Sequence, residues 1–496
     1  MAHPPLQPNP QEFLRLAASH RVIPVWTELV ADAETPVTAF AKITGDEPAF
    51  LFESAEQDEK SGRYSILGTG AEREFLARGR HFEIRSGGEI LRSGEADDPL
   101  AELEKEMSPL HAPSGMPHFP GGCVGYLAYD SIRYFEPTIP PAPKDELGVT
   151  DLYFFTTDRV LVFDHRTRRL KIIVNAYPGE DPAAAYDEAC RKISGLVVAL
   201  REPAVLPPLF TGAGTTPSEV SSNTTRGEYH AMVERAKEYI RAGDIFQIVP
   251  SQRFETPFNG APLDLYRALR FVNPSPYMFL LRCPGFQLVG SSPEVHVRVD
   301  DGRIQIRPIA GTIRRGATPE EDNANAEVLL ADPKERAEHL MLVDLARNDV
   351  GRIAEFGSVR VTDFMTIERY SHVMHIVSNV VGQLSPGHST YDVMRATFPA
   401  GTVSGAPKVR AMQIINELEK SKRCSYAGAV GYFGYDGNLN SCIALRTVLL
   451  KDGKAYVQAG GGVVADSTPE GEYQETINKA MGVMRAIERA RTAGNP

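Results

Sequence analysis

A run of glycines beside a cluster of carboxylates is the first feature of the sequence that could do chemistry. Residues 460–480 read GGGVVADSTPEGEYQETINKA, so three glycines precede Glu470, Glu472 and Glu475. Glycine allows the backbone to approach a ligand closely, whereas neighbouring acids repel an anion. The stretch therefore fits an anionic ligand only if a cation screens the acids.

A helix is expected to carry these acids, because Ser467 and Glu470 fit a capping box and Pro469 suits the first turn. Glu475 and Lys479 then lie one turn apart. The simpler interpretation of this face is an exposed ion pair of little energetic consequence, and it stays open beside the chemical one.

A second expected helix spans residues 332–353, DPKERAEHLMLVDLARNDVGRI. Asp332 is its expected cap, and Glu335 completes a capping box. Glu338 falls on one face with Met341, Leu342 and Leu345, beside the apolar run LMLV. A carboxylate there is costly unless a cation or hydrogen-bond donors meet it. Two carboxylates from two helices, together with water and substrate oxygens, would suit Mg²⁺.

Two further segments keep a structural and a functional interpretation open. The loop FPAGTVSGAPKVRAM (398–412) lacks the phosphate-loop spacing, yet it leads into a helix at Pro407, where free N–H groups could meet an anion. His372 and His375 lack the H-E-x-x-H pattern, so zinc is not predicted. A buried structural histidine is the simpler interpretation of His375.

The bulk properties exclude several classes of protein. The 496 residues carry a net charge of −11, which disfavours general nucleic-acid or anionic-membrane binding. Five cysteines without a C-x-x-C pair indicate a reduced, cytoplasmic protein. We expect no signal peptide, and no apolar run reaches the length of a membrane span.

The chain is expected to divide at a linker rich in Pro, Gly, Ser and Thr, residues 202–225. It separates an N-terminal region, 1–201, from a C-terminal region, 226–496. Expected strands follow one another directly or through hairpins, as in 158–176. This order favours an α+β fold with an antiparallel sheet over a doubly wound one.

Seven strings resemble the chorismate-utilising enzymes, in that family's order, across residues 225–485. They are PIAGT, EHLMLVDLARND, HVMHIVSNV, FPAGTVSGAPK, YAGAVGYFG, CIALRT and QAGGGVVADSTPEGEYQETINKA. Seven such strings in the same order are specific evidence for this family, whereas a single string would be weak evidence. The resemblance implies an antiparallel two-sheet sandwich flanked by helices, with 226–496 as the chorismate-binding catalytic region and 1–201 as a regulatory and structural region.

The resemblance also implies a role for each matching residue. Glu338 and Glu475 match the Mg²⁺ ligands of the family. The matches to substrate-binding positions are Gly311, Thr312, Tyr426, Arg446, Gly460, Gly461, Gly462 and Lys479. The matches to catalytic positions are Glu294, a general acid for the departing 4-hydroxyl group, His375, linked to the elimination step, and Thr402.

The implied reaction joins ammonia to C2 of chorismate and then eliminates pyruvate, giving anthranilate, the first step of tryptophan synthesis. Glutamine hydrolysis needs a nucleophilic cysteine with a histidine partner, and nothing in the sequence resembles such a module. We therefore expect ammonia to come from a separate glutamine amidotransferase subunit.

Feedback inhibition by tryptophan is a further expectation from the resemblance. LFESAE, with Ser54, and NPSPYMF match the family's tryptophan site. The matching residues of the second string are Asn273, Pro276, Tyr277 and Met278. A structural turn with packed aromatic side chains is the alternative interpretation.

Other members of the family aminate C4 or add water, and two positions argue against both reactions. C4-aminating relatives usually have a lysine where this sequence has Ala310, and water-adding relatives have a lysine base where it has Gln247. A non-catalytic chorismate or tryptophan sensor is the alternative from another class. The ordered set of catalytic matches argues against that sensor.

Overall fold

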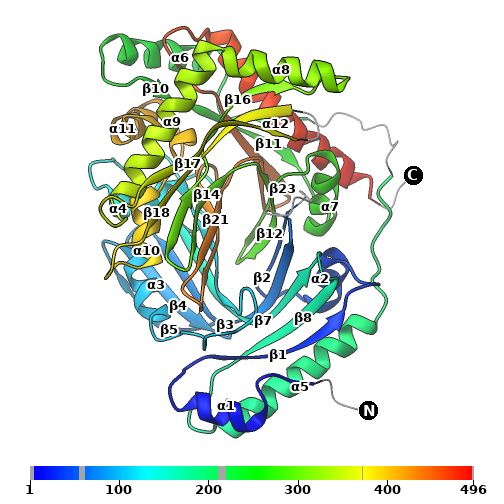
Figure 1. Ribbon diagram of the computed structural model, residues 1–496. Helices are drawn as coiled ribbons and strands as arrows, with labels where there is room; N and C mark the ends of the chain where they lie inside the picture. The colour runs from blue at the N-terminus through cyan, green and yellow to red at the C-terminus, as the bar shows by residue number, and fades with distance from the viewer. Residues whose placement is uncertain (1–4, 55–61, 211–218, 371–372, 494–496) are drawn as a thin grey trace.

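The computed structural model describes residues 5–54, 62–210, 219–370 and 373–493. Its strands form a large antiparallel sheet with helices on the outside (Figure 1). The helices are α1 Pro10–Ala17, α2 Pro36–Ile43, α3 Pro99–Met107, α4 Ile132–Phe135, α5 Pro182–Arg201, α6 Arg226–Arg241, α7 Pro262–Val272, α8 Pro319–Ala331, α9 Pro333–Gly351, α10 Thr390–Thr397, α11 Lys408–Leu418 and α12 Pro469–Arg491, with short η1 Tyr129–Ser131 and η2 Gly401–Val403.

The strands range in length from 2 residues in β9 to 15 residues in β3. They are β1 Ile23–Val30, β2 Ala49–Glu53, β3 Tyr64–Arg78, β4 His81–Ser86, β5 Glu89–Glu95, β6 Gly122–Leu127, β7 Leu152–Asp164, β8 Arg169–Ala176, β9 Ser221–Ser222, β10 Gln247–Ile248, β11 Ser251–Pro257, β12 Tyr277–Cys283, β13 Phe286–Ser292, β14 Val295–Asp300, β15 Arg303–Ile306, β16 Ile309–Arg314, β17 Arg360–Arg369, β18 Val373–Gln383, β19 Gly405–Ala406, β20 Ala429–Gly434, β21 Leu439–Ile443, β22 Thr447–Lys451 and β23 Lys454–Gly460.

The sheet divides into two layers that share β3 and β7. One layer continues from β3 through β2, β12, β13, β22 and β23 to β11. The other continues from β7 through β6, β20, β21, β14, β15 and β18 to β17. The β3–β7 register shifts between Ala71 and Glu74, and such an irregularity bends a strand. The expected antiparallel core flanked by helices is confirmed.

Both faces of the shared core are apolar, as β12 illustrates. Its Phe279 and Leu281 belong to the cluster between the two layers, which also contains Tyr126 of β6. Its Met278 and Leu280 point the other way, into the cluster beneath α5, α7 and α12. Side chains alternate across a strand, so a continuous apolar run is required here. A third cluster lies beneath helices including α3, α10 and α11.

The predicted linker does not interrupt the sheet. Strand β2 pairs with β12, and β6 pairs with β20, so strands from both sides of residues 202–225 join one sheet. Residues 211–218 of that linker lie outside the described residues. The division into 1–201 and 226–496 stays a prediction about the sequence.

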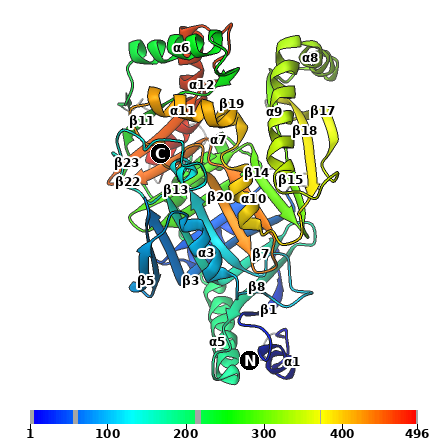
Figure 2. The same cartoon turned by 90° about the vertical axis from the view of Figure 1, so that its left-hand side faces the viewer.

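Helices α9 and α12 position the expected metal ligands, and their caps differ in part from expectation. Asp332 caps α9 by accepting from the N–H groups of Lys334 and Glu335, but no capping box forms there, and the side chain of Glu335 faces other acids. Thr468, not Ser467, caps α12, while the Ser467 hydroxyl accepts from the N–H of Val464. Figure 2 shows α8, α9, β17 and β18 on one side of the upper part, with α6 and α12 on the other.

Candidate functional site

Four acids from two helices gather at the first part of the site. Glu335 and Glu338 lie on one face of α9, and Glu472 and Glu475 lie on one face of α12, because residues three apart are neighbours on a helix. Burial raises the pKa of Glu335, and the charges of Glu338, Asp332 and Glu475 raise that pKa further. The acids of α9 and α12 therefore repel one another across the site.

Glu472 is the most constrained of these acids. Its Oε2 is buried and has no hydrogen-bond partner among the described residues. Burial raises the pKa of Glu472, the Ser467 hydrogen bond opposes this, and the charge of Glu475 adds to the rise. An unsatisfied buried carboxylate oxygen is costly, and no described residue donates a hydrogen bond to Glu472 Oε2.

The glycine run is bare because other protein atoms occupy the space of its side chains. A Cβ on Gly460 would stand 2.7 Å from the hydroxyl of Tyr426, and one on Gly461 would stand 2.6 Å from Glu472 Oε2. A Cβ on Gly462 would stand 3.0 Å from Gln247 Nε2. The glycines therefore leave room for side chains of the candidate site as well as for a ligand.

Two polar contacts join the acids to the glycine run. Gln247 Nε2 donates to Glu338 Oε1 at 3.1 Å. Lys479 Nζ lies 2.6 Å from Glu475 Oε1 and donates to the carbonyl oxygen of Gly460 at 3.0 Å. The simple Glu475–Lys479 ion pair thus exists, but it also holds the end of β23.

The acids fit a divalent cation that is shared with water and substrate. No group of three or more His, Cys, Asp or Glu side chains within the described ranges could itself hold a metal ion. The carboxylates repel one another, and Glu472 Oε2 is buried without a hydrogen-bond partner among the described residues, so a bound cation would stabilise the cluster. Mg²⁺ keeps several waters and commonly uses one or two protein carboxylates, so Glu338 and Glu475 suit it.

Glu294 lies in the second part of the site, just before β14. Its carboxyl group is buried, and Thr402 Oγ1 of η2 donates to its Oε1 at 2.7 Å. Burial raises the pKa of Glu294 to about 8, against the opposing effect of the Thr402 hydrogen bond. Both residues line a small cavity of about 20 Å³ that reaches α9. The side chain is therefore mostly protonated at neutral pH.

His375 of β18 lies against β16 in the third part. Its Nδ1 is 2.8 Å from the carbonyl oxygen of Gly311 and 3.0 Å from Thr312 Oγ1. A carbonyl only accepts, so Nδ1 carries the proton and the neutral ring keeps its lone pair on Nε2. Burial lowers the pKa of His375, which favours that neutral form. Gly311 has a φ of +68°, which favours glycine there. His372 lies outside the described residues.

Arg446 supplies an uncompensated positive charge. No hydrogen bond or ion pair of its guanidinium exists with the part of the chain that the structure describes. Burial lowers the pKa of Arg446, and the charge of Arg446 helps to lower the pKa of His375. A desolvated cation of this kind needs an anionic partner. The Tyr426 hydroxyl lies beside Gly460, and burial raises the pKa of Tyr426 to about 12.

Electrostatic interactions join these parts into one site. Lys479 acts on Glu294, and Glu475 acts on Tyr426. The expected catalytic, substrate-binding and metal-binding residues thus converge from α9, α12, η2, β16, β18 and the ends of β22 and β23.

The expected tryptophan-site residues lie together elsewhere. Ser54 directly follows β2, whose Glu53 is opposite Met278 in the β2–β12 register. Asn273 ends α7, and its side chain donates to Ser291 Oγ at 3.5 Å. Ser291 N–H in turn donates to the carbonyl of Arg446 at 3.2 Å. Pro276 and Tyr277 stand at the start of β12, and the last two residues of LFESAE lie outside the described residues.

Sequence reasoning gave Glu335 and Glu472 no role in the site and did not place Gln247 beside Glu338. A signal for the two acids existed, because each candidate metal ligand has a glutamate three residues before it. Such pairs share a helix face. The Gln247–Glu338 contact has no comparable signal, since the residues are distant in sequence.

Comparison with known proteins gives the family. Residues 47–485 match the family described as chorismate binding enzyme. The chain belongs to the chorismate-binding enzyme family. It is 47% identical over 489 residues to "Anthranilate synthase component 1" of Pseudomonas putida, covering 97% of this chain and 99% of that protein. It is 48% identical over 500 residues to the protein of that name from Aquifex aeolicus, covering 97% of each.

Solved structures agree with this family assignment. Anthranilate synthase component I from Streptococcus pneumoniae superposes with a TM-score of 0.76 and 38% identity, covering 92% of this chain and 98% of that one. The menaquinone-specific isochorismate synthase from Escherichia coli has a TM-score of 0.72 at 18% identity, over 96% and 98% of the chains, and shows the shared fold alone. The resemblance to chorismate-utilising enzymes is confirmed.

Proposed function

We propose that this chain acts as an anthranilate synthase component 1. It would add ammonia to C2 of chorismate and eliminate pyruvate, giving anthranilate. The observation that carries this proposal is the likeness to proteins of that name along nearly the whole chain. The charges and hydrogen bonds of the candidate site support it.

Substrate binding needs positive charge in an acidic protein, because chorismate carries two carboxylates. The half-buried Arg446 guanidinium, which lacks a protein partner among the described residues, offers that charge to the enolpyruvyl carboxylate. Tyr426 and Lys479 would bind the same group from beside the glycine run. Glu338 and Glu475 would hold Mg²⁺, which stabilises negative charge on a bound carboxylate.

Glu294 is the proposed general acid for departure of the 4-hydroxyl group. A general acid must hold its proton at working pH and release it in the transition state. The pKa of Glu294, which burial raises to about 8, meets this need. The Thr402 hydroxyl donates to Glu294 and so stabilises the carboxylate that remains after proton transfer.

His375 is the proposed participant in the elimination step. The Gly311 carbonyl fixes the proton on Nδ1, leaving Nε2 able to accept one. Removal of a ring proton and departure of the enolpyruvyl group as pyruvate make the ring aromatic for the first time. Thr312 contacts Nδ1 from β16 and is placed to orient the same ring.

Ammonia is proposed to arrive from a glutamine amidotransferase subunit, and tryptophan is proposed to bind at Ser54 and the start of β12. The designation "component 1" in the relatives' names supports the existence of a second component. Within the described ranges, no helix is long and apolar enough to span a bilayer. We place the enzyme in the cytoplasm.

The C4-aminating and water-adding reactions are less well supported. Ala310 lies in β16 opposite Ile376 and offers no amine for a covalent adduct. The Gln247 amide donates to Glu338 and cannot deprotonate water near neutral pH. Both positions favour amination by free ammonia at C2.

The test is to incubate the purified chain with chorismate, Mg²⁺ and ammonium at alkaline pH and to identify the products by mass. We expect anthranilate and pyruvate in equal amounts, and no isochorismate when ammonium is left out. Isochorismate formed without ammonium, or no consumption of chorismate, would refute the proposal.

A further inference from the structure

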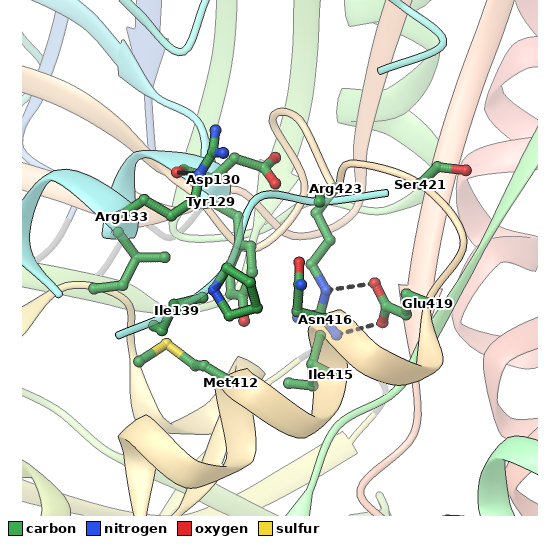
Figure 3. A pocket seen from close by; sticks show the side chains of 13 residues that line it. Tyr129, Asp130, Arg133, Ile139, Met412, Ile415, Asn416, Glu419, Ser421 and Arg423 are labelled. Carbon is green, nitrogen blue, oxygen red and sulfur yellow. Dashed lines mark hydrogen bonds and ion pairs between the residues drawn. The ribbon is translucent and has the colours of Figure 1, made fainter. Parts of the chain in front are cut away.

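A buried ion pair outside the proposed catalytic set occupies the junction of three site segments. Arg423 is 2% exposed, and its partner Glu419, just after α11, is 8% exposed. Arg423 Nε donates to Glu419 Oε2 at 2.9 Å, and Nη2 donates to Oε1 at 2.5 Å. Figure 3 shows both contacts beside a small cavity of about 20 Å³.

The guanidinium also holds two backbone segments of the site. Its Nη1 donates to the carbonyl of Val403 at 2.9 Å, and its Nη2 donates to the carbonyl of Val249 at 2.5 Å. Val403 directly follows Thr402, the hydrogen-bond partner of Glu294. Arg423 therefore fixes the turn that carries Thr402.

Glu419 and Tyr426 extend the junction to the glycine run. Glu419 Oε1 accepts from both the N–H and the hydroxyl of Ser251, at 2.8 Å each. Ser251 pairs with Gly460 in the β11–β23 register. The Arg423 guanidinium lies 5.4 Å from the ring centre of Tyr426. The Arg423–Glu419 ion pair thus contacts both the turn that carries Thr402 beside Glu294 and the strand that pairs with Gly460.

A structural role alone does not account for this choice of residues. Burying two charges costs desolvation free energy, and well-packed apolar residues often replace a buried ion pair without loss of stability. The planar guanidinium differs from an apolar side chain because it offers several hydrogen-bond donors at fixed angles. At this junction those donors reach a carboxylate and two carbonyls from different segments.

We infer that Arg423 and Glu419 are positioning residues, which set the turn of Thr402 against Glu294 in register with the glycine run. The inference rests on the proposed function. It makes Arg423 act on catalysis through Thr402, without contact with the substrate.

The pH dependence of turnover can detect this action. The Thr402 hydrogen bond lowers the pKa of Glu294, so displacement of the Thr402 turn raises that pKa. Among the described residues, His296 in β14 and Asp349 of α9 line the same cavity as Glu294, and the charge of Lys479 of α12 also acts on Glu294. Arg423→Lys leaves all three in place.

The experiment measures kcat against pH for the full-length chain with chorismate, Mg²⁺ and a fixed concentration of free ammonia. Arg423→Lys keeps the charge but cannot reproduce the fork and both carbonyl contacts. We expect kcat to fall about tenfold or more. We also expect the alkaline limb of the pH profile, which is the fall of kcat at high pH, to move to higher pH in Arg423→Lys, by no more than it moves in Thr402→Val. In a Thr402→Val background, Arg423→Lys should move the limb no further.

Lys422→Met is the matched control. Lys422 is the neighbour of Arg423 in the chain and is also buried. It forms ion pairs with Asp151, at 2.8 Å, and with Asp145, and neither acid belongs to the Arg423–Glu419 junction. It should leave the alkaline limb in the wild-type position. If Arg423→Lys does not fold, Glu419→Gln is measured instead, with a shift in the same direction expected.

Three results would overturn the inference: an unmoved limb in Arg423→Lys or its substitute, an equal further shift in the Thr402→Val background, or the same shift in Lys422→Met. Failure of the proposed function is distinguishable from these results. In that case the wild-type chain itself would give no anthranilate.

Discussion

Removing the Thr402 hydroxyl should change the proton affinity of Glu294 by a measurable amount. In Thr402→Val the carboxylate loses the donor that lies 2.7 Å from Oε1, while side-chain volume hardly changes. A hydrogen bond to a charged group contributes about 1.5–3 kcal/mol, and 1.36 kcal/mol corresponds to about one pKa unit. Since water can replace part of the contact, we expect the pKa of Glu294 to rise by about one unit.

The assay follows anthranilate fluorescence under saturating chorismate across the pH range. Total ammonium is adjusted at each pH so that the concentration of free ammonia stays constant. As a general acid, Glu294 must be protonated, so kcat of the wild-type chain should fall above the pKa of about 8. In Thr402→Val the plateau should be lower and the decline should begin about one unit higher.

The control is Thr44→Val, which removes a hydroxyl that donates to the Phe40 carbonyl at 2.8 Å, at the end of α2. Its pH profile should match that of the wild-type chain. A decline at the same pH in Thr402→Val, or at lower pH, would refute the reasoning about Glu294.

Three other predictions concern the metal site, inhibition and stability. Glu338→Gln and Glu475→Gln should each abolish turnover with ammonium and leave the circular dichroism spectrum unchanged, because a neutral amide is a poor Mg²⁺ ligand; near-normal activity in either variant would contradict the two-carboxylate site. Ser54→Arg should remove inhibition by tryptophan with kcat preserved, and unchanged sensitivity would contradict that site. Glu294 holds its proton in the folded chain up to a pH of about 8, whereas its usual pKa is 4.5. Between pH 4.5 and about pH 8 the unfolded chain therefore binds fewer protons than the folded chain, so the free energy of unfolding falls as the pH rises through this range. Glu294→Gln should therefore raise the urea midpoint, more at pH 8 than near pH 4.5, and an equal gain at both would contradict the raised pKa.

The sequence alone predicted the elements that carry local signals. Asp332 caps α9 as expected, and the helix after Pro407 begins where the loop ends. The predicted cap of α12, Ser467, lies one residue before the observed cap, Thr468. Both residues carry a hydroxyl group that can cap a helix. Only the folded chain decides which of them accepts from the helix.

The site depended on contacts between distant segments, which local patterns do not encode. Glu335 fitted a capping box, yet the approach of α9 to α12 places its carboxyl group among other acids. Sequence alone predicts that the Gly460–Gly462 run leaves space for a ligand, but Tyr426, Glu472 and Gln247 fill the space beside it. The resemblance to a known family supplied residue roles that spacing and periodicity could not.

The position of nitrogen on the product ring tests the central proposal most directly. The purified chain is supplied with chorismate, Mg²⁺ and ¹⁵N-labelled ammonium, and the aromatic product is examined by NMR while pyruvate is quantified. We predict ortho-aminobenzoate carrying the label, with one pyruvate for each ring. A para-amino product, an unlabelled product, or a ring formed without pyruvate would contradict amination at C2.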